Sequence, residues 1–170
     1  MVFVMFFLSS CSQLPPSIDT FKGRTPNVDV KEYFAGEINA WGFIQDWSGK
    51  VSRRFTVKMV GTWKGDVGTL EEDFVYDDGE KQKRIWTLTK TGHNTFIGEA
   101  SDVIGKAKGA QEGNALNMKY TLRVPFKGKS IDIKINDWLI LLDEKRLMNI
   151  SVLSKFGINL GRLTIFFEKK

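Results

Sequence analysis

Cysteine has the most distinctive chemistry of any residue type in this 170-residue chain, and it occurs once, at Cys11. The apolar run Met1–Leu8 and the small residues Ser9 and Ser10 come directly before it. This order is typical of a bacterial lipoprotein signal, in which a diacylglyceryl group joins the cysteine sulfur and cleavage makes that cysteine the N-terminus. The sequence therefore predicts lipid attachment at Cys11, with residues 1–10 as a signal segment.

Acyl chains such as palmitate on Cys11 would hold the protein on a membrane, so the predicted location is the bacterial cell envelope. An Asp after the cysteine commonly retains such proteins in the inner membrane. The residue here is Ser12, which favours the outer membrane, facing the periplasm. The run is too short for a transmembrane helix, which needs roughly 20 apolar residues. It also has no Lys or Arg, so a chance cysteine after an apolar start remains the alternative.

Three charged residues stand at positions where strand alternation would place them beside apolar neighbours. Glu72 alternates with Leu70 and Phe74, Arg84 precedes Trp86 and Leu88 at the same spacing, and Asp102 lies between Ala100 and Ile104. Unpaired charges are costly to bury, so these side chains should pair with one another or serve a ligand. Structural pairing is the alternative that the sequence favours.

Aromatic side chains could form the apolar wall of a ligand cavity around these charges. The candidates are Trp63, Phe74, Trp86 and Tyr120. An apolar wall with a few polar anchors is the usual composition of a small-molecule site. A core filled with the same aromatics explains the sequence equally well, so both interpretations stay open.

Several kinds of chemistry find no support in the sequence. His93 is the only histidine and lies in a turn, which disfavours a catalytic triad and a histidine metal site. The acidic run at residues 71–80 lacks the spacing of a calcium loop and is expected to be a solvated hairpin. No cofactor motif is present, no catalytic residue is predicted, and we expect a protein that is not an enzyme.

Length and charge fit one domain. Residues 11–27 contain Pro15, Pro16 and Pro26 without periodicity, which indicates a lipidated N-terminus and flexible tether. Residues 28–170 are enough for a single core. The net charge of +5 favours contact with anionic lipid, but the basic residues are dispersed and match no nucleic-acid motif.

Period-two alternation broken by turn signals predicts an all-β domain. Residues 27–34 are expected to hold at most one helical turn. The expected strands cover residues 33–47, 51–63, 69–77, 81–90, 95–106, 114–124, 130–142, 146–153 and 162–168.

Eight or nine sequential strands form an antiparallel up-and-down meander, and closing it into a barrel removes its exposed edges. A barrel of about eight strands is filled by side chains or holds one small ligand. Charged residues on one face of each strand argue against a barrel that spans a membrane. We therefore predict a lipocalin-like barrel.

Motifs along most of the chain resemble a family of short bacterial lipoproteins that has only a domain-of-unknown-function label. They include Ala40-Trp41-Gly42, Gly61-Thr62-Trp63, the block from Glu71 to Glu80, and Ser154-Lys155-Phe156-Gly157. The resemblance implies a lipid-anchored envelope domain with no assigned activity. A more distant likeness to lipocalins concerns architecture alone, because Ile38 stands where a lipocalin would have Trp.

Three functions follow in order of preference. The first is binding of an apolar or amphipathic small molecule or lipid, with Arg84 pairing an anionic head group. The second is a non-enzymatic accessory role in which the barrel binds another envelope protein. The third is a small barrel enzyme that uses Glu72, Asp102 or His93 as acid or base.

Overall fold

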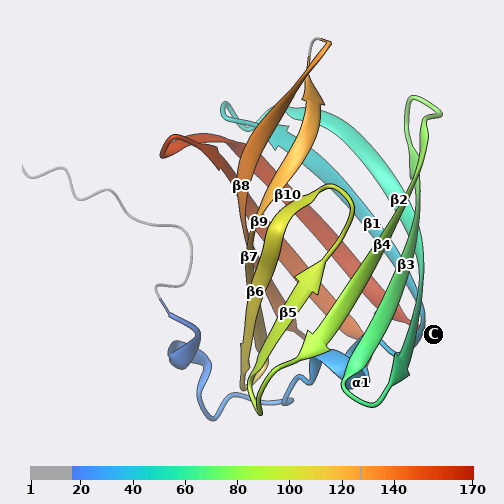
Figure 1. Cartoon of the computed structure of the whole chain (residues 1–170), viewed down its shortest axis with the longest axis vertical. Coiled ribbons are helices and arrows are strands. Elements are labelled where there is room, and N and C mark those ends of the chain that lie inside the picture. The colour runs from blue at the N-terminus through green and yellow to red at the C-terminus, as the bar shows by residue number, and fades with distance from the viewer. Residues whose placement is uncertain (1–16, 127) are drawn as a thin grey trace, which may run out of the picture.

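The computed structural model describes residues 17–126 and 128–170, so Cys11 and the predicted signal segment lie outside the described residues. The described chain is a barrel of antiparallel strands with two short helices near its N-terminus (Figure 1). The elements are η1 (Ile18–Phe21), α1 (Val30–Tyr33), β1 (Gly36–Asp46), β2 (Val51–Lys64), β3 (Val67–Tyr76), β4 (Lys81–Lys90), β5 (Thr95–Glu99), β6 (Val103–Glu112), β7 (Ala115–Phe126), β8 (Lys129–Leu141), β9 (Arg146–Lys155) and β10 (Ile158–Lys169).

The prediction of a closed up-and-down meander is confirmed. Each strand pairs with its neighbour in the sequence, and β1 pairs with β10 from Ile38 opposite Lys169 to Asp46 opposite Gly161. Closure gives every strand two partners. The short β5 pairs with Thr87–Lys90 only, so within the described chain residues 81–86 of β4 have no strand partner on that side. Barrel diameter grows with strand number, so ten strands enclose more interior than the eight that side chains just fill.

Two differences from the expected strands have local causes. The first strand begins at Gly36, because residues 30–33 form α1. The strand expected over residues 95–106 is two strands, β5 and β6, separated by a tight turn in which the Val103 amide donates to the Ala100 carbonyl over 3.1 Å. Ser101-Asp102 is the turn signal, since short polar side chains stabilise turns.

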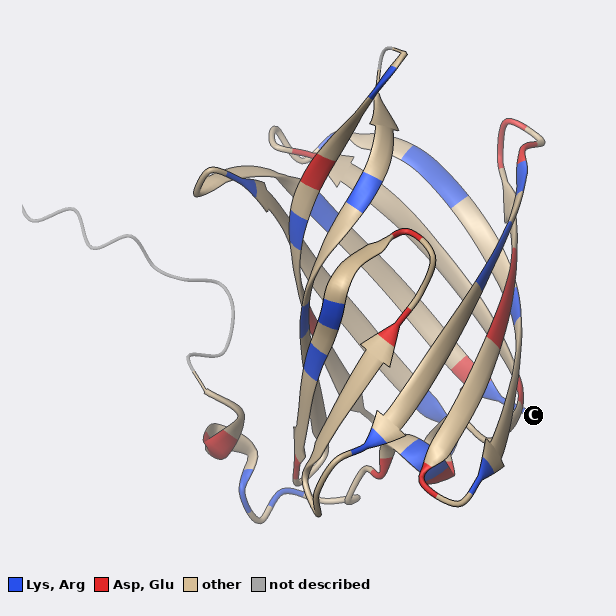
Figure 2. Cartoon of the chain, in the orientation of Figure 1, with Lys and Arg blue, Asp and Glu red and all other residues tan. Residues whose placement is uncertain are grey.

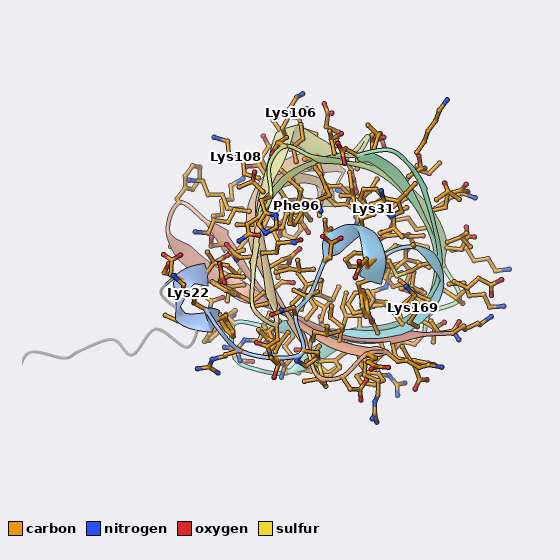
Figure 3. The ribbon with its side chains drawn as sticks, turned by 90° about the horizontal axis from the view of Figure 1, so that it is seen from below. Lys22, Lys31, Phe96, Lys106, Lys108 and Lys169 are labelled. Atoms are coloured by element: carbon orange, nitrogen blue, oxygen red, sulfur yellow. The ribbon has the colours of Figure 1, made fainter. Side chains whose placement is uncertain are left out.

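Helix α1 closes one end of the barrel, hereafter the closed end, and lies inside the ring of strands when viewed from below (Figure 3). Its N-cap is Asp29, whose carboxylate accepts from the amides of Lys31 and Glu32 and from Lys90 Nζ at 2.7 Å. Gln111 Oε1 accepts from the Val30 amide. These bonds satisfy the backbone amides that the start of a helix leaves without partners. A helix of only four residues can therefore hold a fixed position in the closed end, and we call it the plug.

The opposite end, hereafter the open end, carries the turns between β1 and β2, β3 and β4, β7 and β8, and β9 and β10 (Figure 1). Interior side chains at the closed end are fully packed. Those of Ile38, Leu116 and Leu147 keep at most 1% of their surface exposed. The core therefore sits against α1.

The N-terminal segment lies against the outer wall of the barrel. Within the residues expected as a tether, η1 places the Phe21 ring 5.7 Å from the Trp138 ring, and both residues are buried. Trp138 and Ala115 belong to this small outer cluster and not to the interior. In the described part of the chain, no helix has the length and apolar character needed to cross a bilayer.

Candidate functional site

The β3–β4 hairpin builds the first part of the candidate site. The turn at Asp78-Gly79 fixes a register in which Glu72 lies directly opposite Arg84. Both residues share a strand face with Leu70 and Phe74, which pack in the barrel core. Glu72 and Arg84 therefore point into the barrel, which alternation alone left open.

Asp102 joins these two side chains from the turn between β5 and β6. Its Oδ2 accepts from Arg84 Nη2 at 2.7 Å and from Arg84 Nε at 3.0 Å. Glu72 Oε2 lies 4.0 Å from Arg84 Nη1, on the other side of the guanidinium. The three predicted residues thus meet, and two carboxylates already engage the arginine. The expectation that Arg84 pairs an anionic ligand head has to be corrected accordingly.

Sequence reasoning missed a third buried carboxyl, Asp137 on β8. It lies opposite Ser151, and burial raises its pKa, a rise that the side chains of Ser151, Tyr120 and Asn149 offset only in part. Its alternation with Ile133 and Ile135 was the available signal, but the apolar run after Asp137 obscured which face points inward. We call Glu72, Arg84, Asp102, Tyr120 and Asp137 the interior polar cluster.

Burial governs the electrostatics of this cluster. It raises the pKa of Glu72 to about 7, since Arg84 offsets the desolvation only in part and the charges of Asp102 and Asp137 add to the rise. It also raises the pKa of Asp137 to about 6. Burial and the charge of Asp137 hold the pKa of Tyr120 well above its usual value. Burial alone would lower the pKa of Arg84, but Glu72 and Asp102 raise it instead.

The cluster has a surplus of acceptors. Three carboxyls face one guanidinium, so the cluster is anionic whenever both Glu72 and Asp137 are ionised. Within the described residues, Asp102 Oδ1 and Asp137 Oδ1 are buried and have no hydrogen-bond partner. A buried acceptor without a donor is costly, so the cluster is suited to a group that donates hydrogen bonds or carries positive charge.

Aromatic rings surround the cluster. Trp86 packs edge-on against Tyr120 with ring centroids 5.4 Å apart, and the Arg84 guanidinium lies 5.6 Å from the centre of the Phe74 ring. Phe74 stacks on Tyr76. Of the predicted wall residues, Trp63 lies apart, because its indole donates to the Phe34 carbonyl beside α1.

Accessibility inside the barrel changes from the closed end to the open end. On β1, Ile38 is buried while Ile44, nearer the open end, packs against the core and keeps accessible surface. On β10, Phe167 is buried while Leu163 and Ile165 are only partly so. A filled core therefore lies beside α1, and apolar side chains nearer the open end keep part of their surface accessible.

The other candidate chemistry lies at the surface. His93 is exposed in the turn after β4. Around the β3–β4 turn, Arg53 bonds to Asp78 at 2.7 Å and to Glu80 at 2.6 Å, so these acids form ion pairs. No group of three or more His, Cys, Asp or Glu side chains in residues 17–126 and 128–170 is arranged to hold a metal ion.

Fold and site together define a closed ten-stranded barrel with a polar cluster inside and one open end. The chain belongs to the protein family of unknown function DUF3833, whose model matches residues 5–169. This match confirms the predicted resemblance to an uncharacterised family. None of the curated proteins compared with the chain is significantly similar to it.

Solved structures share the barrel. The S-type phycobiliprotein lyase CPES from Guillardia theta is similar with a TM-score of 0.58 and 9% identity, over 84% of this chain and 94% of that one. A redesigned β-barrel, mFAP1 bound to DFHBI, gives a TM-score of 0.43 and 11% identity, over 84% of this chain and 100% of that one. At this identity the lyase shows the fold alone.

Proposed function

We propose that the protein binds a small amphipathic ligand in the open half of the barrel. The observation that carries the proposal is the interior polar cluster, which lies beside apolar side chains that keep accessible surface. The ligand's apolar part would contact Phe74, Tyr76 and Leu163. Its polar part would lie at Asp102, whose side chain is 25% exposed and the most accessible of the three carboxyls.

The charge of the cluster selects the ligand's polar group. An anionic head would approach three carboxyls and an arginine that they already neutralise. An amine, a hydroxyl or an amide N–H would instead donate to the acceptors that lack partners. A cationic or donor-bearing head with a long apolar body is therefore the preferred ligand class.

Matched twelve-carbon probes test this preference. Dodecylamine, dodecanol and dodecanoate, each below its micelle concentration at pH 7.5, would be titrated into the purified protein and followed by calorimetry. We expect dodecylamine to bind at least about tenfold more tightly than dodecanoate, which corresponds to about 1.4 kcal/mol. Equal or tighter binding of dodecanoate, or no binding of any probe, would contradict the proposal.

Paired variants locate the binding. Asp102→Asn and Glu72→Gln should reduce the preference for dodecylamine over dodecanoate. Phe74→Ala should weaken the binding of all three probes. Glu71→Gln is the matched control, because Glu71 neighbours Glu72 but points outward and pairs with Lys83. The proposed activity is binding without turnover. Mass spectrometry of a ligand recovered after incubation would reveal a chemical change if the cluster instead acts as an acid–base catalyst.

The predicted lipid attachment completes the proposal. The binding barrel would act at the bacterial cell envelope, held at the outer membrane by acyl chains on Cys11. Growth with an alkyne analogue of palmitate should label the protein, and Cys11→Ser should abolish the label. An unlabelled wild-type protein would contradict lipid attachment at Cys11 but would not affect the proposal of a ligand site in the barrel.

A further inference from the structure

One arc of the open end carries exposed apolar side chains at its tips. Trp47, in the turn after β1, is 79% exposed, and Phe156, at the tip of the β9–β10 hairpin, is 89% exposed. Ile158 follows at 67%. These tips are neighbours, because Asp46 pairs with Gly161 where β1 and β10 close the barrel. Together they form one continuous feature, which we call the rim arc, residues 46–51 and 154–162.

The conformation at the hairpin tip is unusual for its residue. Phe156 has a φ of 52°, in the left-handed region that glycine and asparagine adopt most readily. Packing does not explain a phenylalanine there, since its ring is almost wholly exposed. A bulky ring kept at a tip that smaller residues would fit better points to contact with something outside the chain.

Basic groups accompany the apolar tips. Lys155 Nζ lies 5.3 Å from the centre of the Phe156 ring, and Lys50 lies in the neighbouring turn. Below the hairpin, a surface hollow of about 560 Å³ is lined by Arg123, Lys134, Lys155, Asp132, Ser130, Thr121, Ile131 and Phe156. Arg123 pairs with Asp132, and the charge of Lys155 also acts on that carboxylate. Lys134 and two hydroxyl groups complete the lining that would receive an anion.

The rest of the open end differs in charge. The β3–β4 turn, across the mouth from the rim arc, carries Asp77, Asp78 and Glu80 (Figure 2). Arg53 and Arg54 pair with these acids, so this side of the mouth carries ion pairs, whereas the exposed apolar tips gather at the rim arc.

We propose that the rim arc docks on the surface of a bilayer that contains anionic phospholipid. Phe156, Ile158 and Trp47 would enter the interfacial region, where aromatic side chains are favoured. Lys50, Lys134 and Lys155 would meet the headgroups, and the hollow would receive a lipid phosphate. Because the exposed apolar tips lie on one side of the mouth, the open end would face the membrane obliquely. This inference does not rest on the proposed ligand.

Vesicle flotation tests the docking surface. The full chain with Cys11→Ser, which cannot be acylated, would be mixed with vesicles of phosphatidylcholine alone or with 30% phosphatidylglycerol. We expect stronger partitioning onto the anionic vesicles, a loss of at least tenfold in Phe156→Ser/Ile158→Ser, and loss of the lipid preference in Lys134→Glu/Lys155→Glu. Val60→Ser/Val75→Ser, which changes exposed valines of β2 and β3, should partition as before.

Equal partitioning of the tip variant and its parent would overturn the proposal, as would equal binding to both kinds of vesicle. Thermal unfolding of each variant confirms that it is folded, which we expect because the tips lie outside the core. Sedimentation velocity without lipid tests whether the rim arc instead binds a second copy of the chain. A dimer that the tip substitutions abolish, with vesicle binding unchanged, would assign the rim arc to self-association and contradict membrane docking.

Discussion

At the scale of single residues, the interior polar cluster is held by one arginine among three carboxyls. Glu72 and Asp137 have raised pKa values of about 7 and about 6, compared with ordinary values of 4.5 and 3.8. The folded protein therefore binds their protons more tightly than the unfolded chain does. This difference makes the stability of the barrel depend on pH in a window that surface carboxyls with lowered pKa values, such as Asp143 at about 2, do not share.

The free energy of unfolding should fall as pH rises from about 5 to 7.5. In this window the folded state holds protons that the unfolded state has released, and linkage makes stability decrease with pH. A shift from 4.5 to about 7 at Glu72 corresponds to a loss on the order of 3 kcal/mol. Urea unfolding at several pH values measures this change in the free energy of unfolding.

Glu72→Gln isolates the contribution of that residue. The neutral amide should roughly halve the pH slope, because Asp137 still titrates, and should raise stability at pH 8. Glu71→Gln, the outward neighbour, should leave the slope as in the parent. An unchanged slope in Glu72→Gln would show that another group causes the pH dependence.

At the scale of elements, the plug formed by α1 depends on a close backbone approach. A Cβ placed on Gly61 of β2 would lie 1.6 Å from the Phe34 carbonyl oxygen, at the end of α1. Gly61 thus lets the chain turn from the plug into β1 while Phe34 packs against Phe167. Any side chain at this position must displace the plug or β2.

Gly61→Ala should be strongly destabilising, by roughly 4 kcal/mol or more, because backbone and not a flexible side chain blocks the new methyl group. Val60→Ala, one residue earlier and on the exposed face, should cost within about 0.5 kcal/mol. Chemical denaturation of the two variants tests the contrast. Similar stabilities of the two variants would mean that α1 does not occupy the closed end of the barrel in the position described.

At the scale of the whole molecule, the barrel is packed at one end and accessible at the other. The two halves of β7 provide an internal comparison, because both are paired with β8 along their length. On the other side the pairing with β6 continues to Leu122, and the Arg123 amide donates to the Asp102 carbonyl. Residues 115–118 belong to the closed half, where Leu116 is buried in the interior and Ala115 in the outer cluster with Phe21, and residues 121–124 lie toward the open end.

Hydrogen exchange should therefore be slower in residues 115–118 than in residues 121–124, since opening the closed half disrupts more packing. Mass spectrometry of overlapping peptides resolves the two halves. A bound amphipathic ligand should raise the protection of the second half alone. Equal protection without ligand would indicate that the barrel is packed evenly from end to end.

The sequence by itself determined most of the strands and, by alternation, which of their residues share a face. Alternation placed Glu72 and Arg84 beside apolar residues. Their position opposite each other follows from a three-residue turn, Asp77–Gly79, between Tyr76 and Glu80, which the Asp78-Gly79 signal alone did not specify. The sequence also indicated the short helix that precedes β1. Cys11 stays a prediction from the sequence, outside the described residues.

Only the tertiary structure decided how far along the barrel each inward residue lies. Trp63 and Phe74 share the inward face of neighbouring strands, yet Trp63 contacts the plug and Phe74 the polar cluster. Asp102 meets Arg84, and Asp137 meets Ser151, through pairings that only the closed barrel fixes. Alternation is a local property of the backbone. The position of a residue along the barrel axis depends instead on the register of all ten strands, which is fixed only when β1 pairs with β10.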